Sequence, residues 1–139
     1  MIRIAIVFVR NRVGDYFVHR RRPEKRVFPN RYGIGAGGRI EPDETPVVGA
    51  ARELTEETGL TVPIEHVCDF PFESGGVHYT VHFYFAQADG PIPNHDAEWS
   101  DSGFRKEAEV RALIASGQMC PDTAECFRRL MKREGAAGG

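Results

Sequence analysis

Apolar residues recur along this chain with two periodicities, and each periodicity predicts one kind of secondary-structure element. Continuous or alternating apolar stretches predict four β-strands, at residues 2–9, 16–21, 65–72 and 77–88. Turns are expected within the two pairs of strands, at residues 11–15 and at Ser74-Gly75-Gly76. Near the end of the chain the spacing becomes helical, which predicts helices at residues 106–116 and 121–133.

A further helix is expected between Thr45 and Gly59. Thr45 suits the N-cap, Pro46 suits the first helical position, and Gly59 suits the position just after the last turn. Apolar residues on one arc predict the packing face of this helix: Val47, Val48, Ala51 and Leu54. The opposite arc gathers three carboxylates, those of Glu53, Glu56 and Glu57.

These carboxylates repel one another unless a cation lies between them or water surrounds them. Oxygen-only ligands favour Mg²⁺, with Mn²⁺ as the alternative, over Zn²⁺. Arg52 lies one turn before Glu56 and is expected to fix the position of that carboxylate. The glycines within residues 35–38 would let the backbone approach a metal-phosphate cluster closely. An ordinary solvated acidic face is the alternative for the helix alone.

Length and composition restrict the organisation of the chain. Its 139 residues, 41% of them hydrophobic, fit a single domain over 1–134, followed by a tail at 135–139 that is expected to be disordered. Proline-rich loops are predicted around residues 23–29 and at 90–94. Strands interspersed with helices indicate an α/β or α+β class, and the sequence contains no repeat or linker.

Charge and cysteine content indicate the kinds of partner to expect. A net charge of -2 and a pI near 6.2 predict no attraction to duplex nucleic acid or to an anionic membrane. The apolar runs are too short to span a bilayer. Three cysteines without paired spacing indicate a reducing cytoplasm. A homodimer stays open.

The spacing of residues 38–60 identifies a family. Read as G-x5-E-x7-R-E-U-x-E-E-x-G-U, with U aliphatic, it contains Gly38, Glu44, Arg52, Glu53, Leu54, Glu56, Glu57, Gly59 and Leu60. The chain therefore resembles the Nudix hydrolases, the superfamily that includes MutT. This resemblance implies a mixed β-sheet sandwiched between helices, and a metal-dependent pyrophosphohydrolase that cleaves the diphosphate of a nucleoside diphosphate linked to another group.

The resemblance also implies roles for residues. The expected metal site comprises Glu53, Glu56 and Glu57 with Gly37, and Arg52 supports it. In this family an acid from a downstream loop often joins the box carboxylates as ligand or general base, and Glu98, with Asp96 nearby, is the candidate. The expected substrate-binding residues are Gly38, Glu44 and, from the basic stretch, Arg20, Arg22 and Lys25.

The substrate is indicated mainly by missing features. The proline expected downstream in ADP-ribose hydrolases is absent, because Gly75 and Gly76 occupy that region. Signatures for coenzyme A and NADH are also missing, so nucleoside di- or triphosphates are favoured by elimination. Residues 18–21, Lys25 and residues 28–30 are similar to the branch related to isopentenyl-diphosphate isomerase. An isomerase-like enzyme and a non-catalytic Nudix ligand-binding module are therefore the alternatives. The isomerase's cysteine segment is absent, and the intact box argues against the module.

Two further groups of residues are candidates either for substrate binding or for structural roles. Alternation in the strand at 77–88 places His78, Thr80, His82 and Tyr84 on one face, which could line a substrate cleft. The two histidines would lie about 13 Å apart, too far for one metal. Three aromatic residues are candidates either for stacking on a nucleobase or for core packing: Phe28, Tyr32 and Trp99.

Overall fold

The computed structural model of the chain describes residues 1–92 and 96–138, with side chains through residue 135. Seven strands form one sheet: β1 (Ile2–Arg10), β2 (Tyr16–Arg21), β3 (Tyr32–Ile34), β4 (Ala36–Arg39), β5 (Glu65–Ser74), β6 (Val77–Gln87) and β7 (Trp99–Arg105). The helices are α1 (Pro46–Thr58), α2 (Glu107–Ala115) and α3 (Pro121–Gly138).

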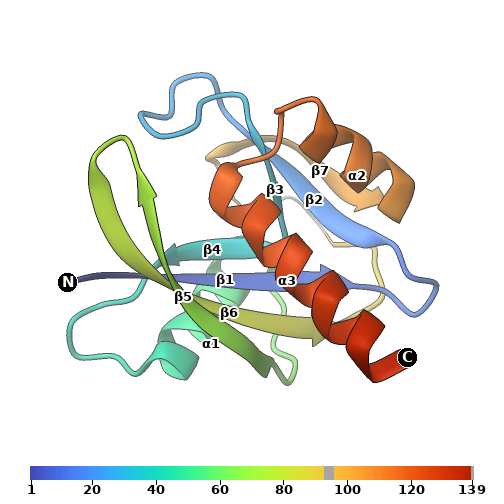
Figure 1. Ribbon diagram of the computed structural model, residues 1–139, viewed down its shortest axis with the longest axis horizontal. Coiled ribbons are helices and arrows are strands. Elements are labelled where there is room, and N and C mark those ends of the chain that lie inside the picture. Colours follow the sequence, from blue (N-terminus) through green and yellow to red (C-terminus); the bar gives the residue numbers. More distant parts are fainter. Residues whose placement is uncertain (93–95, 139) are drawn as a thin grey trace.

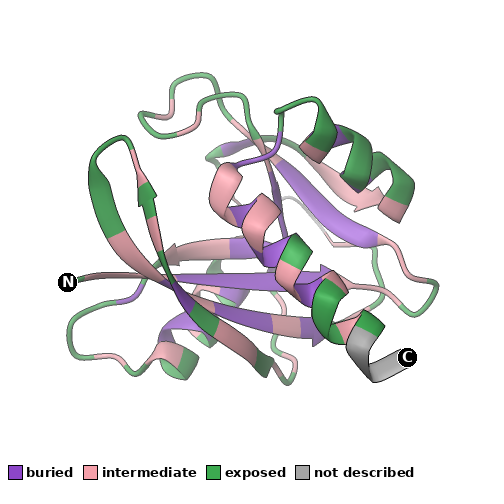
Figure 2. Ribbon diagram, in the orientation of Figure 1, coloured by how far each residue is buried: buried purple, intermediate pink, exposed green. Residues whose placement is uncertain are grey.

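Strand β1 is the centre of this mixed sheet. It runs parallel to β6, with Ile6 opposite Phe83, and antiparallel to β4, with Ile6 opposite Gly37. The other pairings are antiparallel, and the main path of the sheet is β3-β2-β1-β6-β5, with β4 beside β1 and β7 beside β2. Because β1 lies between layers on both faces, its apolar run from Ala5 to Val9 is buried throughout, as Figure 2 shows.

The two faces of the sheet carry separate cores. On one face, α2 and α3 pack against the strands through Val110, Leu113, Cys126, Phe127 and Leu130. On the other face, α1 contributes Ala50 and Leu54 to a core with Val7, Phe17 and Trp99. Figure 1 shows α3 crossing the sheet on the face opposite α1. The expected sheet between helices is confirmed.

The packing face predicted for α1 is correct only at Leu54, which is buried. Val47 and Val48 are 48% and 54% exposed and Ala51 is exposed too, while Gly49, Ala50 and Thr58 are buried. The small residues Gly49 and Ala50 let the helix lie close to β4 and β1. On the helical wheel, Glu53 and Glu57 fall between Gly49 and Leu54 and so face the sheet. The carboxylates are therefore held against the sheet.

Strands β3, β4 and β7 were not predicted, whereas β1, β2, β5 and β6 match the expected strands closely. The turn at Gly75 and Gly76 is present, both at positive φ. Helix α3 continues to Gly138, whereas the sequence indicated an end at 133 and a disordered tail at 135–139; residue 139 lies outside the described residues. Residues 93 and 94 of the loop predicted at 90–94 also lie outside them. None of the described helices is long and apolar enough to cross a lipid bilayer.

Candidate active site

Two glutamates of α1 lie directly over the glycines of β4. The backbone N–H of Gly37 donates a hydrogen bond of 2.9 Å to Oε1 of Glu57. A β-carbon at position 38 would overlap the carboxyl group of Glu53, so a side chain there would push that carboxylate out of its present position. The Glu53 side chain is 12% exposed. The glycine run and the acidic helix are therefore parts of one site.

Burial and mutual proximity change the acidity of these two groups. Burial raises the pKa of Glu57 to about 9; the Gly37 N–H opposes this rise, and the neighbouring charge of Glu53 adds to it. Burial also raises the pKa of Glu53, against the lowering effect of Arg52. Without a metal, the pair therefore holds a proton at neutral pH. A divalent cation can replace that proton, because it satisfies both carboxylates at once.

The oxygen atoms of Glu53 and Glu57 fit Mg²⁺ or Mn²⁺. Across residues 1–92 and 96–138, no three His, Cys, Asp or Glu side chains are grouped closely enough to form a complete metal cage. Mg²⁺ does not require one, because it commonly takes one or two carboxylates and completes its shell with water and substrate phosphate. The third predicted ligand, Glu56, has a side chain that is 58% exposed and is paired with Arg52.

Arg52 connects the carboxylates of the box. Its guanidinium lies 2.7 Å from Oε2 of Glu44, 2.9 Å from Oε1 of Glu53 and 3.2 Å from Oε2 of Glu56. The predicted contact with Glu56 is present, but it is the longest of the three. The hydrogen bonds from Arg52, followed by one from the Glu41 N–H, lower the pKa of Glu44 to about 2. Glu44 supports Arg52 and is not among the described residues that line the pocket.

A pocket of about 290 Å³ opens beside the two glutamates. Its lining comes from five parts of the chain: His19 and Arg21 on β2, Lys25 in the loop that follows, Gly37 and Gly38 on β4, Glu53 and Glu57 on α1, and the segment with Asp96, Glu98 and Trp99. It thus places acidic residues opposite basic residues, as a site for a metal and a diphosphate requires.

Of the three basic residues predicted to bind substrate, the structure brings Lys25 to this pocket. Its Nζ lies 2.9 Å from Oε2 of Glu98. Arg20 and Arg22 are not among the described residues of the lining; Arg20 stacks over the ring of Tyr32 at 5.2 Å, and Arg22 donates to the carbonyl of Ala97.

The pocket is lined by Arg21, where the sequence had predicted its neighbours Arg20 and Arg22. Alternation along β2 is set by Phe17, which is buried on the α1 face, so His19 and Arg21 follow it on that face. Arg20 points to the other side. Counting every second residue from the buried Phe17 would have predicted Arg21. The predicted residues Arg20 and Arg22 follow the opposite alternation.

The candidate base lies on a segment tied to the basic loop. Glu98 lines the pocket with a side chain that is 61% exposed, and its backbone N–H donates 2.8 Å to Oδ1 of Asp96. The backbone N–H of Arg22 donates 3.0 Å to the carbonyl of Glu98. The structure therefore brings both predicted loop acids to the pocket.

His19 is a site residue that sequence reasoning missed. Burial lowers its pKa to about 4, so the ring is neutral, and Nδ1–H donates 2.8 Å to the carbonyl of Gly35. The ring stacks on Trp99 with centroids 4.4 Å apart and planes at 5°. Trp99 is 3% exposed and belongs to the core, so it adopts the packing role of the two considered for it.

The polar face of β6, with His78, Thr80, His82 and Tyr84, contributes no described residue to this pocket or to a second cavity beside it. His82 instead contacts Asp69 at 2.8 Å, and Asp69 also contacts His66 at 2.8 Å.

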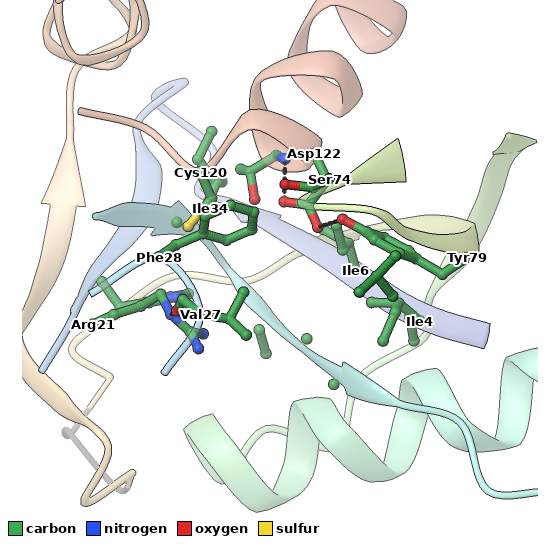
Figure 3. Close-up of a pocket in the computed structure, with 18 residues that line it drawn as sticks. Ile4, Ile6, Arg21, Val27, Phe28, Ile34, Ser74, Tyr79, Cys120 and Asp122 are labelled. Atoms are coloured by element: carbon green, nitrogen blue, oxygen red, sulfur yellow. Dashed lines mark hydrogen bonds between the residues drawn. The ribbon is translucent and has the colours of Figure 1, made fainter. Parts of the chain in front are cut away.

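The opposite face of β6 contributes Tyr79, together with Val77, to the second cavity, which has a volume of about 280 Å³. Figure 3 shows this second cavity, which Phe28 also lines. It shares His19, Arg21, Gly37 and Gly38 with the acidic pocket, so the two spaces adjoin.

Comparison with known proteins agrees with this geometry. The sequence matches the NUDIX domain family over residues 1–130. It is 31% identical over 140 residues to an uncharacterised Nudix hydrolase of Streptomyces coelicolor, covering 98% of this chain and 77% of that protein. The chain therefore belongs to the Nudix hydrolase family.

Solved structures show the same fold. A MutT protein from Methanosarcina mazei matches with a TM-score of 0.80 and 20% identity, over 96% of this chain and 94% of that chain. The NUDIX domain of NrtR from Shewanella oneidensis, crystallised with ADP ribose, matches with a TM-score of 0.78 and 18% identity, over 94% of this chain and 86% of that chain.

Proposed function

We propose that this protein is a Mg²⁺-dependent pyrophosphohydrolase that cleaves the diphosphate bond of a nucleoside diphosphate linked to another group, with a nucleoside di- or triphosphate as substrate. The observation that carries the proposal is the placement of Glu53 and Glu57. They lie together over the Gly37 and Gly38 backbone, in the same pocket as Arg21 and Lys25, and burial raises the pKa of both. Mn²⁺ is the alternative cation.

The residues that would hold the cation are Glu53 and Glu57, with Glu56 beside them on α1 and the backbone of Gly37 on β4. When bound there, the cation would neutralise charge on the diphosphate and increase the acidity of the attacking water. Arg52 keeps the carboxylate of Glu53 in place through its 2.9 Å contact.

The basic side chains of the pocket bind the substrate. Lys25 and Arg21 supply positive charge for the phosphate oxygens. Binding of a phosphate by Lys25 would compete with its ion pair to Glu98. Glu98 would then be free to accept the proton of the attacking water. Asp96, which lines the same pocket, is the next candidate for that role.

The adjoining cavity favours a substrate with a ring system at one end. Its lining includes apolar groups from Ile4, Ile6, Val27 and Phe28, and it adjoins the phosphate-binding pocket. A small-molecule nucleotide fits such a pair of spaces, since ligand sites are concave, mostly apolar and marked by a few polar groups. The ADP ribose of the Shewanella domain has the same general chemistry, but at 18% identity that likeness shows the fold alone.

An isomerase acting on isopentenyl diphosphate finds less support. Such an enzyme uses a cysteine, and Cys120 is the single cysteine among the described residues lining either cavity. Burial raises the pKa of its thiol to about 12, so it stays protonated and unreactive. The four box glutamates are all present, which also argues against a module that only binds ligand.

The test is phosphate or pyrophosphate release from a panel of nucleoside di- and triphosphates with isopentenyl diphosphate included, with and without Mg²⁺. Glu57→Gln serves as the inactive variant, and Glu125→Gln, on α3 and outside both cavities, is the matched control. Mg²⁺-dependent release from nucleotides by the wild type and the control supports the proposal. Isomerised isopentenyl diphosphate would identify the isomerase instead. Nucleotide binding without turnover would identify a ligand-binding module.

A further inference from the structure

Asp122 is a carboxylate that the hydrolytic mechanism does not use, and it lines the apolar cavity beside the phosphate-binding pocket. It belongs to the first turn of α3. Its Oδ2 accepts a hydrogen bond of 3.0 Å from the hydroxyl of Tyr79, and its Oδ1 accepts one of 2.8 Å from the N–H of Thr123. Figure 3 shows Asp122, Ser74 and Tyr79 together on one side of the cavity, with Arg21 and Val27 on another.

The hydrogen bonds to Asp122 leave part of its capacity unused. An ionised carboxylate offers about four acceptor positions, and the two bonds occupy two of them. Burial raises the pKa of Asp122 while the Tyr79 hydroxyl lowers it, and the side chain is half-buried. A ligand N–H that reaches the ionised carboxylate would form a charge-assisted hydrogen bond, which is stronger than one between neutral groups.

A structural role explains only part of this arrangement. An acidic residue in the first turn stabilises a helix N-terminus, and this accounts for the contact with Thr123. It does not account for a carboxylate lining an apolar cavity beside Tyr79. Among the described residues that line the cavity, Asp122 is the single carboxylate.

The cavity connects this carboxylate to the proposed site of hydrolysis. Its volume of about 280 Å³ is close to the lower end of the range for small-molecule sites, roughly 300 Å³. Phe28, at φ 50°, and Ile4 and Ile6 supply apolar surface that a planar ring can pack against. Because His19, Arg21 and the two glycines line both spaces, one ligand can place its phosphates at Glu53 and Glu57 and its ring beside Asp122.

We infer that Asp122 determines the specificity of this site, selecting substrates whose heterocyclic ring carries an exocyclic amino group over matched rings with a keto oxygen at that position. An amino group donates to the free acceptor positions of the carboxylate. A keto oxygen at the same position would place its lone pairs against them, and the ring N–H beside the keto group could donate to the carboxylate only if the ring shifted in the cavity. This inference rests on the proposed function, because it assumes that the substrate is a nucleotide.

The experiment compares kcat/KM for pairs of nucleotides in which a keto oxygen replaces the amino group: CTP with UTP, ATP with ITP, and GTP with XTP. We expect the wild type to prefer the amino member of at least one pair by about tenfold or more. Asp122→Asn has nearly the same shape but presents its own N–H donors, so it should reduce that preference to about threefold or less. Glu125→Gln, on the same helix and outside the cavity, should leave the preference unchanged.

The outcomes separate this inference from the proposed function. If nucleotides are hydrolysed without preference, or the preference survives in Asp122→Asn, Asp122 does not select the ring and the hydrolase proposal stands. If no nucleotide is hydrolysed, the proposed function fails, and the affinities of the wild type for CMP against UMP and AMP against IMP decide the inference. Equal affinities overturn it. These wild-type measurements also decide it if Asp122→Asn does not fold.

Discussion

Arg52 and Glu44 form a two-point ion pair, with Nε 2.7 Å from Oε2 and Nη2 2.8 Å from Oε1. Two parallel bonds fix the plane of the guanidinium, which leaves Nη1 directed at Glu53, 2.9 Å away. Glu44 itself is held by the N–H of Glu41 at 2.8 Å. The pair therefore positions a carboxylate of the acidic pocket from outside that pocket.

Arg52→Ala is expected to raise the Mg²⁺ concentration needed for half-maximal rate by about 10- to 100-fold, because supporting contacts of this kind contribute that much to metal affinity. Glu44→Gln should also raise the Mg²⁺ concentration needed for half-maximal rate, but by a smaller factor. If the two residues act as one unit, the double variant will resemble Arg52→Ala alone. Additive effects would show that Glu44 acts independently. Glu41→Gln, whose backbone contact is retained, is the control.

His19 should make a destabilising contribution in mild acid, opposite in sign to that of Glu57, whose raised pKa favours the folded state as the pH falls. The pKa of His19 is lowered to about 4 in the folded state by burial, whereas the unfolded ring has a pKa near 6.5. The unfolded state therefore binds a proton first, so the contribution is fully present above pH 6.5 and is lost as the pH falls toward 4. The size of the loss is on the order of 3 kcal/mol.

Urea denaturation of the wild type and His19→Gln at pH 7 and pH 4.5 measures this loss. The variant lacks the titrating ring, so lowering the pH from 7 to 4.5 should raise its free energy of unfolding relative to that of the wild type. His78→Gln, an exposed histidine on β6, is the control and should follow the wild type. Equal pH dependence in all three proteins would show that His19 is not the titrating group.

Glu98→Gln is expected to lower kcat strongly at neutral pH, flatten the acidic limb of the pH-rate profile and leave KM nearly unchanged, because the variant cannot accept the proton from water. Lys25→Met should instead raise KM, since it removes a phosphate contact. Glu24→Gln, next to Lys25 and exposed, is the control. Recovery of Glu98→Gln at high Mg²⁺ would indicate a metal ligand, and unchanged kinetics would move the base role to Asp96 or a box glutamate.

Local chemistry explains why the acidic helix could be predicted closely. Thr45, Pro46 and Gly59 determine its ends through backbone geometry that requires no distant partner, and α1 runs from Pro46 to Thr58 as expected. Its packing face depends on tertiary contact. The large side chains of Val47 and Val48 indicated one face, but the close approach of β4 and β1 favours the small residues Gly49 and Ala50.

The remaining site residues depend on long-range pairing. Strand β7 has few apolar residues and forms because it pairs with β2, which lies far earlier in the sequence, with Phe104 opposite Phe17. This pairing brings the segment with Glu98 and Trp99 beside His19 and Arg21. The cavity at Asp122 is not visible in local spacing, since it depends on which elements become neighbours.

The most direct test of the account is the rate of nucleotide hydrolysis as a function of Mg²⁺ for the wild type, Glu57→Gln and Glu125→Gln. Replacing Glu57 removes a charge that a cation would bind, at a position where an amide preserves shape. We predict that Glu57→Gln lowers kcat by about 10² or more at saturating Mg²⁺, while its folded state is retained and the control matches the wild type. Wild-type turnover in Glu57→Gln, or full activity of the wild type in EDTA, would contradict the account.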